Sequence, residues 1–350
     1  MKILITGNMG YIGPSVIYRL RASYPSATLV GLDTGFFAHC LTNAEKLPES
    51  HLDIQYFADV RKISAQKLEG IDAIVHLAAL SNDPMGNRFE TLTLEINHRA
   101  TIDLATQAKQ AGVSSFVFAS SCSIYGYAEG GPRTESAELN PLTAYARSKV
   151  EAEKNLSALA DDSFTVTSLR FATACGMSER LRLDLVLNDF VASAIGSQRI
   201  CVLSDGSPWR PLINIKDMAR AIDWAVQRPA SQGGKFLAIN TGSNGWNYQV
   251  KQLAEAVALA LPGVTVEINA NAPPDKRSYR VNFDLYKELA PDFQPKVDLM
   301  ATIAELADGL RRMQFRNENF RESQFMRLKV LTHLQEQRLL SERLEWSRAA

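Results

Sequence analysis

The sequence predicts an α/β protein built on a doubly wound parallel sheet, and two observations lead to this prediction. Short β-branched runs alternate with longer segments of helical periodicity, which is the pattern of repeated βαβ units. These runs also show little polar alternation, as expected where helices cover both faces of a sheet. The runs that predict the strands cover residues 2–6, 28–33, 54–58, 73–77, 115–120 and 164–170.

After residue 170 the alternation loosens, and two isolated strands are predicted at 199–203 and 236–241. We therefore expect residues 1–170 to form one domain and residues 171–350 to form a smaller, interleaved α/β portion that mainly binds substrate, with some segments returning to the first domain. From about Leu299 the apolar spacing becomes helical, once over residues 303–310 and again over residues 326–334. Such a helix either packs on its own domain or forms a subunit contact.

Composition excludes several other classes of protein. The 350 residues carry 38 basic and 38 acidic side chains, so no net field favours a polyanion or an anionic membrane surface. Apolar runs are shorter than a bilayer span, and the first apolar run ends in a turn at Gly7, where the apolar core of a secretory signal would continue. We therefore expect a cytoplasmic protein. The cysteines are scattered, with no C-x-x-C pair and no histidine at metal-ligand spacing, which indicates neither a disulfide framework nor a metal site: Cys40, Cys122, Cys175 and Cys201.

Three glycines follow the first predicted strand and open a helical pattern. Gly7 permits a sharp strand-to-helix turn, Gly10 lets a pyrophosphate approach the backbone, and Gly13 allows helix and strand to pack closely. Free N–H groups at the helix start would face the anion. This predicts a Rossmann-like dinucleotide site with contacts from Gly7, Met9, Gly10, Tyr11, Ile12 and Gly13.

Asp33 ends the second predicted strand twenty residues beyond Gly13, the distance expected for the acid that binds the adenosine ribose. The next three residues, Thr34 to Phe36, supply no cation for a 2′-phosphate. We therefore expect NAD in preference to NADP.

Residues after the third and fourth strands extend this site. Asp59 and Val60 are placed to receive the adenine, although an ordinary loop-capping role explains Asp59 nearly as well. Small side chains after the fourth strand would let the cofactor backbone pass over Leu77, Ala78 and Ala79. His76, at the end of that strand, is interpreted as a core or loop residue and not as a catalyst.

Tyr145 and Lys149 are four residues apart in a helical pattern that runs from Thr143 to Leu159, so their side chains share one helix face. A tyrosine titrates near pH 10, and a base near neutrality needs a pKa about two to three units lower. We expect the Lys149 ammonium and a positively charged nicotinamide to supply that shift together. Ser120, Ser121 and Ser123 follow the fifth strand, at the sheet edge where such folds bind ligands.

Taken together, these motifs resemble the extended short-chain dehydrogenase/reductase family, particularly its NAD-dependent nucleotide-sugar epimerases and dehydratases. The resemblance spans most of the chain and includes Ser-Ser-Cys-Ser-Ile-Tyr-Gly at 120–126, Leu169-Arg170-Phe171 and the segment from Arg210 to Asp217. It implies Ser121, Tyr145 and Lys149 as the catalytic residues. It also implies cofactor contacts from Asn97 and Ser120, with Ser123 as a second hydroxyl that touches the sugar.

Several positions depart from the family pattern. Relatives that catalyse 4,6-dehydration resemble one another in an Asp-Glu pair after the catalytic hydroxyl, where this chain has Cys122 and Ser123. The 3,5-epimerising relatives carry a cysteine at the position of Ser123. Thr173 stands where related epimerases commonly have an asparagine that contacts the diphosphate, and the usual Arg-Pro-Gly-Asp element is altered across residues 273–280.

A nucleotide diphosphate sugar requires placed guanidinium groups, because the protein has no net positive charge. The substrate-binding residues expected from the sequence and the resemblance are Ser81, Ser121, Ser123, Tyr145, Thr173, Asn188, Arg210, Arg277 and Arg280, with Arg210 the best candidate and surface ion pairing the alternative for each arginine.

The leading hypothesis is an NAD-dependent nucleotide-sugar epimerase that oxidises and re-reduces a sugar carbon, C4 being favoured. A 4-keto-sugar reductase is the nearest alternative, followed by a decarboxylase or dehydratase of the same family. A non-catalytic NAD-binding regulatory protein is the alternative from another class. The resemblance further implies a homodimer, paired through helices that include residues 145–159.

Overall fold

The computed structural model describes residues 1–128, 130–269, 271–272 and 277–347. At its centre lies a seven-stranded parallel sheet. From one edge to the other, its strands are β10 (Phe236–Thr241), β6 (Thr165–Phe171), β5 (Ser115–Ser121), β4 (Ala73–His76), β1 (Lys2–Thr6), β2 (Thr28–Asp33) and β3 (Ile54–Phe57). This arrangement confirms the predicted doubly wound α/β fold.

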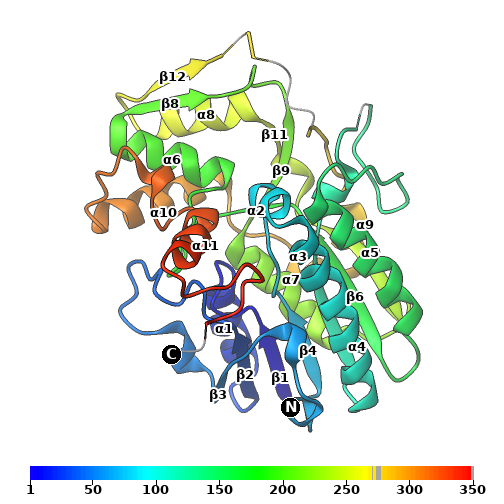
Figure 1. Ribbon diagram of the computed structural model, residues 1–350. Helices are drawn as coiled ribbons and strands as arrows, with labels where there is room; N and C mark the ends of the chain where they lie inside the picture. The colour runs from blue at the N-terminus through cyan, green and yellow to red at the C-terminus, as the bar shows by residue number, and fades with distance from the viewer. Residues whose placement is uncertain (129, 270, 273–276, 348–350) are drawn as a thin grey trace.

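Helices cover both faces of this sheet (Figure 1). In β1, Ile3 and Ile5 join an apolar cluster that includes residues of α1 (Gly13–Ser23) and α7 (Ile215–Gln227). Leu4 points the other way, into a cluster shared with α4 (Ala100–Gln110) and α5 (Ala144–Leu159). Because successive side chains of a strand point to opposite faces, an apolar run buries both sides.

A second layer stands over the carboxyl ends of the strands (Figure 1). It contains a three-stranded sheet of β11 (Asn247–Gln249), β9 (Trp209–Asn214) and β7 (Thr173–Cys175), and a parallel pair of β12 (Thr265–Ile268) and β8 (Arg199–Val202). Its helices include α6 (Val186–Ser197), α8 (Val250–Ala260) and α10 (Leu299–Arg312). The same half of the chain returns β10 and α7 to the central sheet, so the two layers interleave.

The remaining helices are α2 (Asp83–Arg88), α3 (Glu90–Leu94), α9 (Asp284–Leu289) and α11 (Arg327–Glu336), and a π-helical turn, η4, covers Glu95–Arg99. Consecutive strands lie side by side from β1 to β3, but β4 pairs with the opposite side of β1. This change of direction opens a crevice at the carboxyl ends of β1 and β4, which is the usual ligand site of such sheets.

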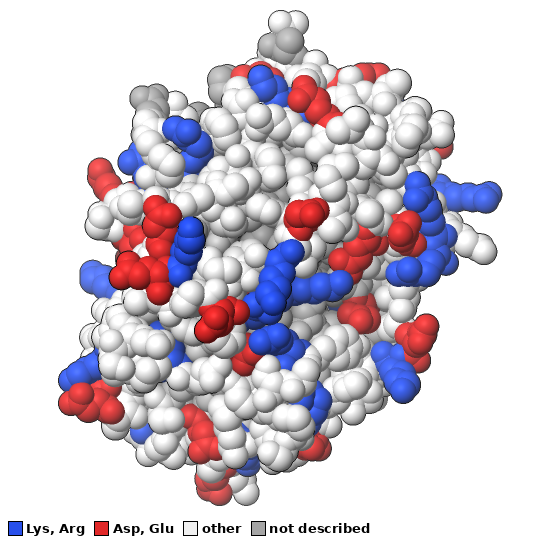
Figure 2. Space-filling model, turned by 180° about the vertical axis from the view of Figure 1, so that it is seen from behind, with Lys and Arg blue, Asp and Glu red and all other residues white. Residues whose placement is uncertain are grey.

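No helix among the described residues is both long and apolar enough to cross a membrane. Lys, Arg, Asp and Glu side chains intermingle over the face seen in Figure 2, without one sign of charge dominating it. The surface therefore agrees with the balanced composition, and charge selectivity has to arise locally.

Candidate active site

The turn between β1 and α1 has the conformation that the glycine spacing predicts. Gly7 has φ of +73°, and a Cβ there would lie 2.5 Å from the backbone N of Ala78. A Cβ on Gly13 would lie 1.8 Å from the Asn8 carbonyl oxygen. Ile12 precedes α1 without any side-chain cap, so the first N–H groups of the helix are left for an anion. The turn thus fits a dinucleotide pyrophosphate.

Asp33 lies at the end of β2, beside this turn. Its carboxylate accepts hydrogen bonds from the backbone N–H of Met9 at 3.0 Å and of Gly35 at 2.8 Å. Burial raises the pKa of Asp33, and the two backbone hydrogen bonds oppose that rise. A carboxylate retains further acceptor positions after two such bonds, so Asp33 remains able to accept a ribose hydroxyl.

Asp59, which was expected to receive the adenine, is itself held by Arg61. The Arg61 Nη2 lies 2.6 Å from Asp59 Oδ2, and the Arg61 backbone N–H also donates to this carboxylate. Both residues line the same cavity as Val60. Asp59 therefore caps its loop and also lines the part of the cavity beside the loops that follow β2 and β3. This part is here called the adenosine end, because the adenosine of the cofactor is expected there.

A cavity of about 700 Å³ joins the glycine turn to the catalytic candidates. This volume is within the usual range for small-molecule sites. The predicted site residues that line it are Gly7, Gly10, Tyr11, Ile12, Asp33, Asp59, Val60, Leu77, Ala78, Ala79, Ser81, Ser120, Ser121, Ser123, Tyr145, Lys149, Thr173, Arg210 and Arg277.

Tyr145 and Lys149 lie on the face of α5 that borders this cavity, and Ser121 ends β5 beside them. Thr143 caps α5 by accepting a hydrogen bond from the Ala146 N–H at 3.2 Å, which places Tyr145 in the first helical turn. Lys149 Nζ lies 5.6 Å from the centre of the Tyr145 ring and donates to the Ala119 carbonyl at 2.7 Å. The three catalytic candidates therefore meet at one place.

We expected Lys149 to help lower the pKa of Tyr145, but the groups of the protein alone do not lower this pKa. Burial raises the pKa of Tyr145 to about 12, while a hydrogen bond with Ser121 acts in the opposite direction. Burial also lowers the pKa of Lys149 to about 7, and the Glu153 carboxylate opposes this shift. A lysine that is largely uncharged above neutrality stabilises a phenolate weakly, so further positive charge is required for Tyr145 to act as a base.

Beneath Lys149, a buried ion pair supports the end of β5. Arg170 Nη2 lies 2.7 Å from Glu153 Oε2, and Ser120 donates to Glu153 Oε1 at 2.6 Å. Ser120 thus links the cavity wall to a charge pair in the core. Breaking such a pair on one side leaves an uncompensated buried charge, so its role is to fix positions.

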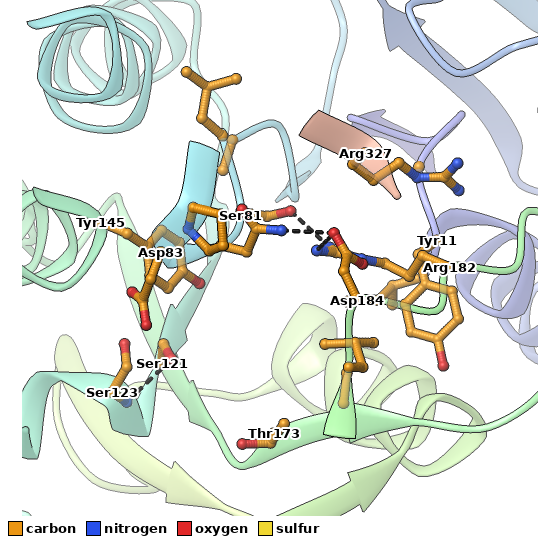
Figure 3. Close-up of a pocket in the computed structure, with 18 of the residues that line it drawn as sticks. Tyr11, Ser81, Asp83, Ser121, Ser123, Tyr145, Thr173, Arg182, Asp184 and Arg327 are labelled. Carbon is orange, nitrogen blue, oxygen red and sulfur yellow. Dashed lines mark hydrogen bonds and ion pairs between the residues drawn. The ribbon is translucent and has the colours of Figure 1, made fainter. Parts of the chain in front are cut away.

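On the substrate side, Ser123 has a buried hydroxyl that borders the cavity and has no hydrogen-bond partner within the described part of the chain. Its backbone N–H donates to Ser121 Oγ at 3.1 Å. Figure 3 shows Ser121, Ser123, Asp83 and Tyr145 gathered around one part of the cavity, with Thr173 nearby. A buried hydroxyl without a partner is costly, and a sugar hydroxyl would satisfy it.

Sequence reasoning missed a polar cluster that crosses the cavity. Arg182 is paired with Asp184 at 2.6 Å and donates to Ser81 Oγ at 2.9 Å, while Asn82 donates to Asp184 at 2.7 Å (Figure 3). Asp83 also lines the cavity, and its carboxylate raises the pKa of Tyr145 and pairs with Arg277 at 2.7 Å. Arg61 and Arg327 also line the cavity, so its wall carries cations although the three residues after Asp33 supply none.

Asn97 and Asn188, which were predicted to contact a ligand, hydrogen-bond within the protein and do not line the cavity. Asn97 is fully buried and bonds both the N–H and the carbonyl of Leu80, at 2.8 and 3.0 Å. Asn188 is equally buried and donates to Tyr11 Oη at 3.0 Å. Their amides are used within the protein, so neither side chain faces a ligand.

Three other predicted residues also lie outside the cavity lining. Arg280 stacks 5.2 Å from the centre of the Trp209 ring and donates to the Gly130 carbonyl. Met9 contributes a backbone N–H to Asp33, and Gly13 makes the close turn contact described above. The altered element expected before Arg277 includes residues 273–276, which lie outside the described residues.

A Rossmann-type sheet, a glycine turn beside the carboxylate of Asp33, and a serine, tyrosine and lysine in one cavity are the features of the extended short-chain dehydrogenase/reductase class. The chain belongs to the NAD dependent epimerase/dehydratase family, whose sequence model matches residues 3–242. Family membership makes NAD the cofactor, and the turn and Asp33 fit it.

Relatives within this family carry different activities. The chain is 29% identical over 238 residues to a Bacillus subtilis protein named uncharacterized UDP-glucose epimerase YtcB, covering 65% of this chain and 73% of that one. It is 26% identical to dTDP-glucose 4,6-dehydratase of Streptomyces griseus, covering 88% of this chain and 91% of that one. The relatives of this chain within the family therefore include both epimerases and dehydratases.

The solved structures show the same fold. A UDP-glucose-4-epimerase from Stenotrophomonas maltophila, solved with bound NAD and formylated UDP-arabinopyranose, superimposes with a TM-score of 0.77. The match covers 90% of this chain and 99% of that chain at 23% identity. At this identity the similarity concerns the fold alone.

Proposed function

We propose that this protein is an NAD-dependent nucleotide-sugar epimerase that acts through a transient keto sugar, with oxidation and re-reduction at C4. The observation that carries this proposal is the meeting of Ser121, Tyr145 and Lys149 in the cavity that begins at the glycine turn. These residue types suit a reaction in which a proton leaves a sugar hydroxyl while a hydride leaves the carbon that bears this hydroxyl.

Each residue has a separate role. Tyr145 accepts the proton of the sugar hydroxyl, and Ser121, which is hydrogen-bonded to Tyr145, polarises the forming carbonyl. Lys149 orients the tyrosine and the ribose. NAD supplies the hydride chemistry when bound, together with the positive nicotinamide charge that Tyr145 requires beyond Lys149.

The residues after the catalytic serine argue against water elimination. Cys122 is fully buried, donates to the Arg170 carbonyl at 3.0 Å, and has a pKa raised by burial. Ser123 has no acidic group to exchange a proton near neutrality. The pair therefore offers neither the acid nor the base that dehydration needs.

The substrate is a sugar attached to a nucleotide diphosphate. Arg210 and Arg277 line the cavity together, and Arg210 donates to the Arg277 carbonyl. A diphosphate is matched by guanidinium groups, which bind its oxygens in pairs. The buried Ser123 hydroxyl, which has no hydrogen-bond partner among the described residues, is suited to the sugar.

The test is a panel of UDP-, GDP-, TDP- and CDP-sugars incubated with the purified protein, with epimers resolved by chromatography and small molecules released from the protein identified by mass spectrometry. The proposal predicts one epimer pair approached from both directions. Stoichiometric consumption of reduced cofactor would instead identify a 4-keto-sugar reductase, and bound NAD without turnover of any sugar would favour a non-catalytic protein.

A further inference from the structure

The chain after α10 returns to the adenosine end of the cavity. In Figure 1, α11 and the red C-terminal segment lie beside the part of the chain that follows β2. Val330, Leu331 and Leu334 of α11 are buried, as are Leu340 at 3% and Leu344 at 0% exposure. All five belong to the apolar cluster that contains Leu32, Phe36 and Val60. The C-terminal segment is thus part of the core that supports the dinucleotide site.

One contact reaches the residue that follows the ribose acid. Trp346 Nε1 donates to the Thr34 carbonyl at 2.6 Å, and its ring lies 5.7 Å from that of Phe36. Thr34 and Phe36 both line the cavity. Trp346 therefore holds the loop after Asp33 from its outer side.

A second contact reaches the adenine side through Arg61. While its Nε and Nη2 donate to Asp59, its Nη1 donates to the Arg343 carbonyl at 3.0 Å and its Nη2 to the Leu344 carbonyl at 3.3 Å. The side chain of Arg61 is only 6% exposed. A guanidinium has five donors in a rigid plane, so this one group fixes Asp59 relative to the C-terminal segment.

Ion pairs on the surface add to these contacts. Arg343 pairs with Glu95 at 2.8 Å, and Lys62 pairs with Glu345 at 3.0 Å. Pairs this exposed contribute little individually. They join the segment to η4 and to the loop after β3. Together with the Trp346 contact to Thr34, they attach both adenosine-side loops to the same ten residues.

We propose that residues 338–347, here called the C-terminal strap, hold the two adenosine-side loops together and thereby slow the release of NAD. Release requires the loops that carry Asp33 and Asp59 to part, and the strap bridges them through Trp346 and Arg61. The inference rests on NAD dependence and not on which sugar is the substrate.

The strap also matters for the type of reaction. An enzyme that takes a hydride and returns it keeps one cofactor through many turnovers, whereas a reductase must exchange its cofactor after every turnover. A retained cofactor therefore favours the epimerase proposed above over a reductase.

The experiment uses the full chain loaded with NAD and the double variant R343A/W346A, which removes the two side chains through which the strap holds Glu95 and the loop after Asp33. The matched control is M300A, because Met300 on α10 is 45% exposed and Trp346 is 46% exposed. The rate of NAD loss is measured by rapid gel filtration after dilution, with the retained NAD released by acid and quantified. Thermal unfolding without NAD reports whether each variant is folded.

The expected result is NAD loss at least about tenfold faster in the double variant, because a loop no longer held by Trp346 parts more readily and affinity changes of this kind act mainly on the dissociation rate. M300A should match the unaltered protein. Equal rates in all three proteins, with amide exchange showing residues 338–347 opened in the double variant, would overturn the proposal. Rapid NAD exchange by the unaltered protein would also overturn it.

The outcome is separable from that of the sugar assay. Faster NAD loss in the double variant without epimerisation of any sugar would support the strap and remove the proposed function. Epimerisation of a sugar with an unchanged rate of NAD loss in the double variant would support the proposed function and remove the strap.

Discussion

Asp83 accepts a hydrogen bond of 2.7 Å from the hydroxyl of Thr143, the residue that caps α5 two positions before Tyr145. The bond ties the start of α2 to the start of the catalytic helix. It also holds a carboxylate close enough to Tyr145 to raise its pKa. The acidity of the proposed base is therefore set partly by a residue outside its own helix.

Replacing Asp83 with asparagine should lower the pKa of Tyr145, because the variant keeps the acceptor for Thr143 but removes the negative charge. A lower pKa means that Tyr145 loses its proton at a lower pH. The limb of the turnover profile that rises with pH should then move to lower pH by about half a unit to one unit.

The measurement is the rate of epimer formation against pH. The control is E90Q, since Glu90 pairs with Arg147 at 2.5 Å and is 59% exposed. If the rising limb of the pH profile stays in place or moves to higher pH in the Asp83 variant, Asp83 does not raise the pKa of the catalytic base.

Replacing Tyr145 with phenylalanine should reduce single-turnover oxidation by about 10²- to 10⁴-fold, because the variant loses the group that accepts the proton. Bound NAD should be unchanged, since the ring is retained. The control is Y18F: Tyr18 on α1 also has a pKa raised to about 12, and its ring packs against that of His51. A fully active Y145F would exclude Tyr145 as the base.

The stability of the protein should depend on His76. This histidine is 1% exposed, bonded to Thr6 and Thr101 hydroxyls at 2.7 and 2.8 Å, and burial lowers its pKa to about 3. Below pH 6.5 the unfolded chain binds a proton that the folded chain does not. Stability is therefore lost as pH falls, by about 2 kcal/mol between pH 7 and pH 5 from this group.

Urea unfolding at pH 7 and pH 5 measures this dependence. The variant H76Q should lose less stability over that interval than the unaltered protein, whatever its stability at pH 7. The exposed His333 provides the control, as H333Q should retain the full dependence. Equal losses in H76Q and the unaltered protein would mean that His76 takes up a proton while folded.

Replacing Asp33 with asparagine should weaken NAD binding by about tenfold or more, the value of a hydrogen bond to a charged group. The preference over NADP should also shrink, because the negative charge that repels a 2′-phosphate is removed. Titration with both dinucleotides measures the two affinities. An unchanged ratio would show that Asp33 does not face the ribose.

The sheet and the cofactor turn could be predicted from the sequence because their signals are local. The strand runs and the spacing from Gly7 to Asp33 each involve a few neighbouring residues with one conformational reason. The strands β7 and β11 have three residues each, too few for a periodic signal, and they were not predicted.

The rest of the site depends on contacts between distant residues. Arg182 bonds Ser81, which lies 101 positions earlier, and no spacing indicates that pairing. Asn188 holds a family position, but the sequence does not tell whether its side chain faces a ligand or Tyr11. The apolar spacing of α11 likewise predicted a packed helix but not the surface against which it packs, which is the adenosine end of the cavity.

The most direct test of the central claim is conversion of a UDP-sugar in deuterium oxide, followed by NMR of the carbon-bound hydrogens and absorbance at 340 nm. A hydride that is taken and returned gives the C4 epimer with no deuterium on any sugar carbon and no lasting absorbance. Deuterium on a sugar carbon, loss of water or carbon dioxide, or stoichiometric cofactor consumption would contradict the account.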